Sequence, residues 1–106
     1  MNPAEESKLQ QVRSRIDELD LQIQALITER AECAKEVAQI KRSAGETSDF
    51  YRPEREAQVL NEVCKRNEGP LPDDHIAKIF REIMSACLAL QQPLKIAFLG
   101  PMGTFT

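Results

Sequence analysis

Positively charged residues at helical spacing are the side chains of this sequence whose types and positions could do chemistry. Arg30 occupies a row of apolar positions at seven-residue intervals, between Ile23 and Val37. An unpaired charge in an apolar interior is very costly, so a guanidinium that faces a core needs an anionic partner. That partner is either a carboxylate of the chain such as Glu56 or an anionic ligand, unless the side chain extends to the surface.

Lys41 lies eleven residues after Arg30, which is almost three helical turns, so both side chains point the same way. Arg13 lies seventeen residues before Arg30, roughly 25 Å along a helix axis and about 100° around it. Arg13 therefore cannot serve the same pocket within one chain, although it could reach the pocket of a second copy. Solvated surface positions for Lys41 and Arg13 are the alternative.

The other polar candidates lie in two later stretches. Gln91 shares a helix face with Cys87 and continues an apolar stripe, so its amide is expected to point inward and to need a partner. The alternative for Gln91 is a helix cap or a solvated helix end. Arg55 and Glu56 lie in the first turns of another predicted helix. The only histidine, His75, is predicted to be exposed. Because the sequence has no catalytic triad, metal-ligand cluster or phosphate loop, a catalyst built from it would act by electrostatics and positioning.

A long amphipathic helix must position the cations of the first stretch. From about Glu5 to Arg42 there is no Pro or Gly, and two apolar rows repeat every seven residues. The rows are Leu9, Ile16, Ile23, Arg30, Val37 and Val12, Leu19, Leu26, Cys33, Ile40. Such a helix would be roughly 55 Å long, too long to bury its stripe against two shorter helices. The sequence therefore predicts an all-α fold of three helices that forms an intertwined homodimer.

Two shorter helices are predicted after a loop over Ser43–Arg52. The first runs from Pro53 to Arg66, with Ala57, Leu60, Val63 and Cys64 on one face. A loop over Asn67–Leu71 follows, and the third helix opens at Pro72 and ends near Gln92. Its apolar stripe comprises Ile76, Ile79, Phe80, Ile83, Met84, Cys87 and Leu90. The remainder, Leu94–Thr106, begins as a strand-like run without a sheet to join, so a disordered or loosely packed tail is expected.

Composition narrows the classes of function. A chain of 106 residues has room for one modest core, and its net charge of −3 argues against a dedicated nucleic-acid binder. The three cysteines form no close pair in the sequence, so neither a disulfide framework nor a zinc site is expected. Free cysteines are typical of a reducing compartment, so a cytoplasmic location is expected. Cys33 and Cys87 are expected to act as small core residues. The sequence shows neither a signal peptide nor an apolar run long enough to span a membrane.

Four segments resemble the chorismate mutase domain at the N-terminus of bacterial bifunctional chorismate mutase–prephenate dehydratases. They are VRSRIDELD (12–20), ERAECAKEVAQIK (29–41), YRPEREAQVL (51–60) and FREIMSACLALQQ (80–92). The tail KIAFLGPMGTFT (95–106) resembles the first strand and turn of the dehydratase domain. The resemblance implies a mutase domain over residues 1–92, then a linker and the truncated start of a dehydratase domain over residues 93–106.

The resemblance also implies a reaction and a role for each candidate residue. Enzymes of this family convert chorismate to prephenate, in phenylalanine and tyrosine biosynthesis, without cofactor, metal or covalent intermediate. By similarity, Arg30 and Arg13 of the partner subunit bind the substrate carboxylates. Lys41 contacts a carboxylate and the ether oxygen, to which Gln91 also donates. Glu56 accepts from the ring hydroxyl, Arg55 lies nearby, and Cys87 lines the pocket where a related enzyme has a small polar residue.

Two positions depart from the family pattern. Some relatives carry Glu in place of Gln91, and a Glu must be protonated to donate. Arg52 stands where a relative has an acid, so the loop over Gly45–Arg52 is assigned no role beyond closing the pocket. Two other functions stay open at this point: an isochorismate pyruvate lyase of the same fold, and a non-catalytic dimerisation or metabolite-binding module.

Overall fold

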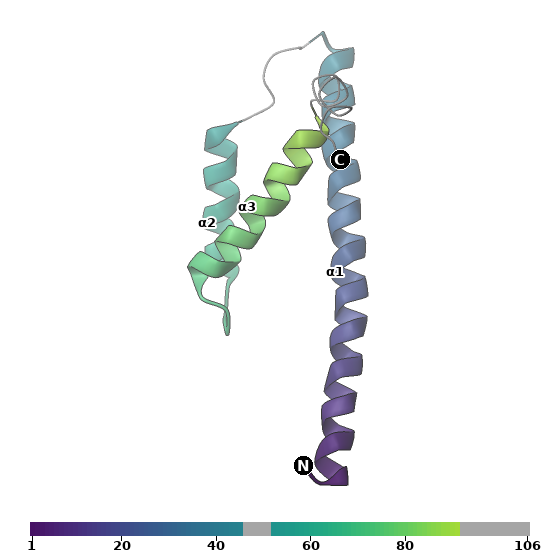
Figure 1. The fold of residues 1–106 in the computed structure, drawn as a ribbon. Coiled ribbons are helices and arrows are strands. Elements are labelled where there is room, and N and C mark those ends of the chain that lie inside the picture. The colour runs from purple at the N-terminus through teal and green to yellow at the C-terminus, as the bar shows by residue number, and fades with distance from the viewer. Residues whose placement is uncertain (46–51, 92–106) are drawn as a thin grey trace, which may run out of the picture. The chain divides into compact units, whose positions relative to one another are not determined.

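The computed structural model describes residues 1–45 and 52–91, and three α-helices are the only regular elements within these ranges. They are α1 (Pro3–Ser43), α2 (Pro53–Arg66) and α3 (Asp73–Leu90) (Figure 1). The all-α prediction with one very long helix is confirmed. Residues 46–51, within the predicted loop, and residues 92–106, which include the predicted tail and the predicted end of the third helix, lie outside the described residues. The chain divides into two compact units, Met1–Arg30 and Ala31–Thr106.

A reciprocal pair of hydrogen bonds fixes the start of α1. The backbone N–H of Glu5 donates to Asn2 Oδ1 over 2.8 Å, and the Asn2 N–H donates to Glu5 Oε1 over 3.0 Å. This is a capping box, and Pro3 at the first helical position loses no hydrogen bond by lacking an N–H. The helix therefore begins at Pro3, two residues before the predicted start.

At its other end, α1 stops where the sequence predicts. The Gly45 N–H donates to the Arg42 carbonyl over 3.0 Å, and Gly45 adopts φ +85°. That left-handed conformation costs a glycine little and ends the helix after Ser43. Lys41 and Arg42, in the last turn, carry the charge that the helix dipole favours there.

The unit Met1–Arg30 exposes its apolar stripe. Val12, Ile23 and Leu26 keep 56%, 52% and 63% of their surface accessible, and Ile16 and Leu19 are exposed as well. A long helix with a solvated apolar stripe is unusual in a monomer, because burial of that stripe is what normally stabilises a helix.

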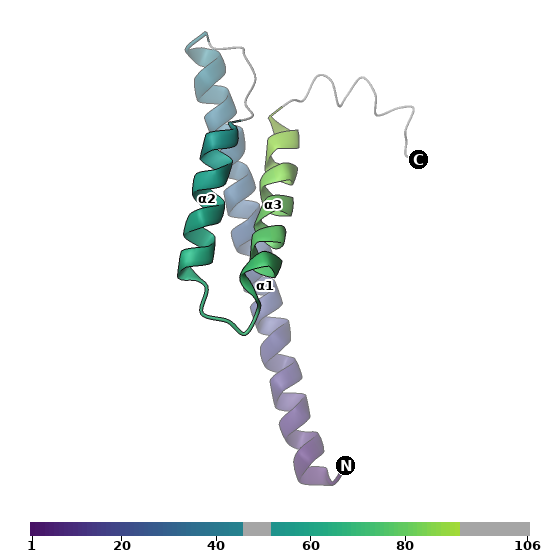
Figure 2. The ribbon, with the colours of Figure 1, turned by 90° about the vertical axis from the view of Figure 1, so that its left-hand side faces the viewer.

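The unit Ala31–Thr106 holds the buried residues. These are Ala38 of α1, Val63 of α2, and Ala77 and Cys87 of α3. Helices α2 and α3 contact each other and lie side by side in both views (Figures 1 and 2). Three of the four buried side chains are small, and small residues let helix backbones approach closely.

The predicted bounds of α2 are confirmed at both ends, whereas α3 is slightly shorter than predicted. Pro72 precedes α3 as its cap, with φ −65° and ψ 156°, and Asp73 is the first helical residue. The helix ends at Leu90, and Gln91 forms its C-terminal cap.

Two details of the predicted apolar faces are wrong within this single chain. Cys33, expected in the core, is exposed, whereas Cys87 is buried as expected. Ala57 of α2 and Ile79 and Leu90 of α3 are also exposed, although all three belong to predicted stripes. Each stripe is wider than the surface that the neighbouring helices of one chain cover.

Candidate active site

Three charged residues stand apart from all the others in the described part of the chain. Arg30, Lys41 and Glu56 are half-buried, whereas every other described Arg, Lys, Asp and Glu is exposed. Withdrawing a charge from water costs free energy unless a partner compensates for it. These three residues are also among those that the sequence singles out, so burial and residue pattern indicate the same candidates.

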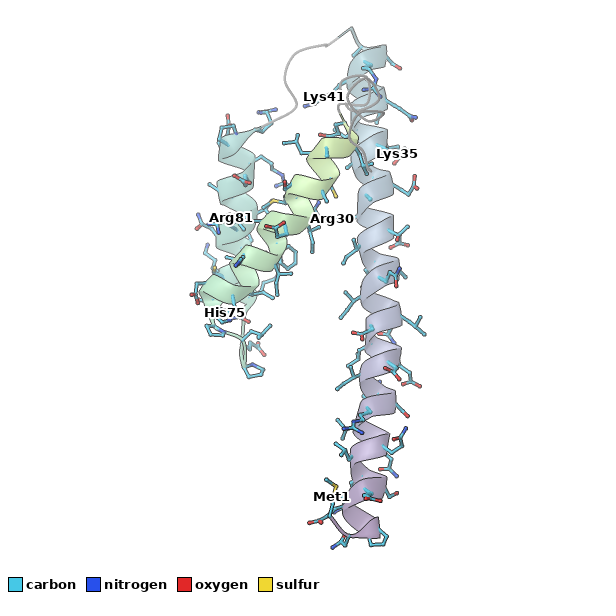
Figure 3. All side chains as sticks on the ribbon, viewed as in Figure 1. Met1, Arg30, Lys35, Lys41, His75 and Arg81 are labelled. Carbon is cyan, nitrogen blue, oxygen red and sulfur yellow. The ribbon has the colours of Figure 1, made fainter. Side chains whose placement is uncertain are left out.

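Lys41 occupies the last turn of α1 (Figure 3). Its neighbour Arg42 shares the favourable position at the helix C-terminus but is exposed. Lys35, six residues earlier, lies about 120° around the helix from Lys41 and is exposed too. The partial burial of Lys41 is therefore specific to its face of α1.

Gln91 joins the end of α3 to α1. Its Nε2 donates to the backbone carbonyl of Ala34 over 2.8 Å, and both residues are half-buried. The expected inward direction of the amide and its need for a partner are thus met. Ala34 lies seven residues before Lys41, so it shares the Lys41 face of α1.

Cys87 lies one turn before Gln91 on α3 and keeps only 6% of its surface exposed. This places a buried thiol on the same face of α3 as the half-buried amide. The family resemblance implies that Cys87 lines a pocket, and this role stays a prediction.

On α2, Glu56 and Arg55 differ in environment. Glu56 is half-buried, whereas Arg55 is exposed and donates from its guanidinium to Gln58 Oε1 over 3.2 Å. Both residues lie in the first turn and a half of the helix, where an acid is favoured by the dipole. The structure thus distinguishes a partly desolvated carboxylate from an adjacent solvated cation.

Arg13 and Arg30 belong to the unit Met1–Arg30. Arg13 is exposed, and Arg30, the last residue of that unit, is half-buried. The exposure of Arg13 fits a surface arginine and equally fits a side chain that is offered to another molecule.

The contact that sequence reasoning missed is the Ala34 carbonyl. A backbone acceptor carries no residue-type signal, and Gln91 is 57 positions away from it. One feature of the sequence indicated such a contact: Gln91 continues an apolar stripe, so its amide was expected to point inward and to need a hydrogen-bond partner.

The described residues match neither the pattern of a metal site nor that of a membrane-spanning helix. Among the described residues, no group of three His, Cys, Asp or Glu side chains is arranged to hold a metal ion. None of the three described helices is both long and apolar enough to cross a membrane.

The chain is similar to chorismate mutases along most of its length. The family model for chorismate mutase type II matches residues 12–92. The bifunctional chorismate mutase/prephenate dehydratase of Pseudomonas aeruginosa is 54% identical over 106 residues, covering 97% of this chain. The chain spans 29% of the length of that relative. The chorismate mutase of Methanocaldococcus jannaschii is 37% identical over 86 residues, covering 80% of this chain and 85% of the relative.

A solved structure agrees with the family match. Chorismate mutase from Thermus thermophilus superimposes with a TM-score of 0.75 at 31% identity, covering 82% of this chain and 97% of that chain. The expectation of an all-helical chorismate mutase domain, made from the four sequence segments, is confirmed by this match and by the family model. The chain belongs to the chorismate mutase type II family.

Proposed function

We propose that this chain converts chorismate to prephenate by an electrostatically stabilised Claisen rearrangement. The observation that carries the proposal is the selective burial of charge: Arg30, Lys41 and Glu56 are the described charged residues that are not exposed. A reaction that breaks and forms bonds within one substrate molecule needs no nucleophile. It needs a compact substrate conformer and stabilisation of developing charge.

The chemistry of the substrate matches this set of residues. Chorismate is a dicarboxylate, and its breaking ether oxygen gains negative charge in the transition state. Arg30 binds a carboxylate, and a guanidinium can do so through two parallel hydrogen bonds. Lys41, with a compact ammonium group, contacts a carboxylate and the ether oxygen. Fixed cations of this kind act most strongly where water is partly excluded. Both side chains are half-buried, so part of the water around them is excluded.

The remaining groups complete the site. Gln91 donates an N–H to the ether oxygen, and Glu56 accepts from the ring hydroxyl. Arg55 lies beside Glu56 in α2, while Cys87 lines the pocket. Burial supports the assignments of Glu56, Cys87 and Gln91, whereas Arg55 is assigned by its position next to Glu56.

A homodimer supplies the missing cation. The exposed stripe of α1, with Val12, Ile23 and Leu26 more than half accessible, is the surface that a second copy covers. Arg13 of the partner subunit then reaches the substrate held by Arg30. The support is the exposure of Arg13 and the distance of seventeen residues that keeps it from its own Arg30.

The domain organisation and location form part of the proposal. Residues 1–92 constitute the mutase domain, and residues 93–106 are a linker and the start of a dehydratase domain. This is supported by relatives with both activities in their names that align with 97% of this chain. A cytoplasmic location is supported by Cys33, Cys64 and Cys87, which no disulfide joins.

The test is the disappearance of chorismate by absorbance, with the product identified by chromatography. Wild-type chain should form prephenate, and Arg30→Ala should lower kcat/KM about 10²- to 10³-fold. Arg15→Ala removes an exposed arginine of the same helix and should leave the rate unchanged. Binding of chorismate without turnover would indicate a metabolite-binding module, and release of pyruvate from isochorismate would indicate a lyase.

A further inference from the structure

In the hydrogen bond between Gln91 and Ala34, the Gln91 side chain is the donor and the Ala34 carbonyl is the acceptor. A backbone carbonyl has lone pairs and no proton, so it accepts hydrogen bonds and cannot donate them. The Gln91 side chain must therefore turn its NH₂ group toward Ala34, and the 2.8 Å distance from Nε2 to the carbonyl oxygen is that of a well-formed bond. The opposite amide orientation would set two oxygens against each other.

This bond uses half of the donor capacity of the amide. The NH₂ group has two protons, and one of them is directed at Ala34. The second proton lies in the plane of the amide, about 120° from the first, because the nitrogen is trigonal. The amide plane is thus fixed by α1 although the residue itself caps α3.

The position of Ala34 along α1 sets the helix face on which the amide is held. Ala34 lies two turns before Lys41, so both residues share a face of the helix. A bond at Ala34 therefore holds the Gln91 amide on the face of α1 that carries Lys41. The acceptor is a main-chain atom of a helix, which is a more rigid support than a side chain or a loop.

We infer that the Ala34 carbonyl is a positioning group: it fixes the Gln91 amide before substrate binds, so that one N–H belongs to the protein and the other to the substrate. The inference rests on the proposed mutase activity for the second N–H. The first N–H, however, donates to Ala34 in the ligand-free chain, so this hydrogen bond can be tested without measuring turnover.

The direct test is hydrogen exchange of side-chain amides in ¹⁵N-labelled wild-type chain without substrate. Gln91→Met identifies the Gln91 resonances by removing them, and Gln39, which is exposed on α1, is the internal control. One Gln91 proton should exchange about fivefold more slowly than the protons of Gln39, and its pair should not. Equal exchange of both Gln91 protons, at the rate of Gln39, would overturn the inference.

The consequence for catalysis is tested with Gln91→Asn, which keeps both N–H groups on a side chain one methylene shorter. It cannot reach Ala34 and the substrate together, so kcat should fall about 100-fold with little change in KM. A kcat within about twofold of wild type would contradict a fixed amide. Wild-type chain that shows the slow proton but no chorismate turnover would refute the proposed function and leave the Ala34 contact intact.

Discussion

The side-chain amide of Asn67 and the carboxylate of Asp73 lie 2.8 Å apart across the connection between α2 and α3. The same Nδ2 donates to the Leu71 carbonyl over 2.8 Å, and Asn67 Oδ1 accepts from the Gly69 N–H over 3.3 Å. One half-buried side chain thus satisfies groups along the whole turn, and no other described residue of this connection makes several such bonds.

Replacing this side chain should destabilise the hairpin of α2 and α3. Asn67→Ala removes all three bonds and should lower the free energy of unfolding by about 1–3 kcal/mol, measured by urea denaturation. Asn61→Ala, an exposed position within α2, is the matched control and should leave stability within about 0.5 kcal/mol. Equal stability of the two variants would show that water replaces the Asn67 contacts without loss.

The capping box at the start of α1 gives a local prediction. Glu5→Ala removes the side chain that accepts from the Asn2 N–H, while Glu6→Ala removes an acid of the same turn that is not in the box. Both changes weaken the interaction with the dipole, so their difference isolates the box. Glu5→Ala should fray the first turn more, by about 0.5–1 kcal/mol in the amide hydrogen exchange of residues 5–7. The same protection in both variants would contradict this.

The sequence predicted those elements whose signals are local. Pro53 and the polar loop before it fixed the start of α2, and the absence of Pro and Gly fixed the continuity of α1. The capping box of Asn2 and Glu5 was present in the sequence, but the prediction began the helix at the first charged residue instead.

Long-range contacts could not be predicted in the same way. The sequence indicated that Gln91 needs a partner, but the Ala34 carbonyl is common to every residue type and so leaves no pattern. The exposure of Cys33 has a different cause: its stripe is apolar, but the described chain alone does not provide the surface that would cover it. The period of apolar residues predicts which face of a helix becomes buried. It does not predict which helix packs against that face.

The neutral amide of Gln91 predicts a flat pH profile. An amide does not titrate, so kcat for chorismate should change little from mildly acidic to mildly basic pH. Gln91→Glu introduces a carboxyl that donates only when protonated. Its activity should therefore be present at low pH and be lost as pH rises through the pKa of the new carboxyl. Parallel profiles for wild type and variant would exclude Gln91 from contact with the reacting atoms.

The burial of Lys41 predicts which lysine of α1 matters for turnover. Lys41→Ala should lower kcat/KM about 10²- to 10³-fold, because it removes a cation from the carboxylate and the ether oxygen. Lys35→Ala removes the same charge from an exposed face of the same helix and should change the rate less than about twofold. Steady-state rates at two salt concentrations separate the site from a general field effect, since only the latter is strongly screened. Similar losses in both variants would point to the general field.

The proposed sharing of each site between two subunits predicts complementation between inactive variants. Arg13→Ala and Arg30→Ala each damage both sites of a homodimer, yet a mixed dimer carries both changes in one site and neither in the other. Mixing the two variants under conditions of subunit exchange should thus restore about a quarter of the wild-type activity, since half of the dimers are mixed and each has one intact site.

The matched control is a mixture of Arg30→Ala and Lys41→Ala, because one chain is proposed to supply both of these residues to a given site. In that mixture every site retains one defect, so activity should stay low. Recovery in the control mixture would place Arg13 outside the partner's site. The same conclusion would follow if Arg13→Ala gave no recovery after native mass spectrometry, with one variant isotope-labelled, had shown that the subunits exchanged.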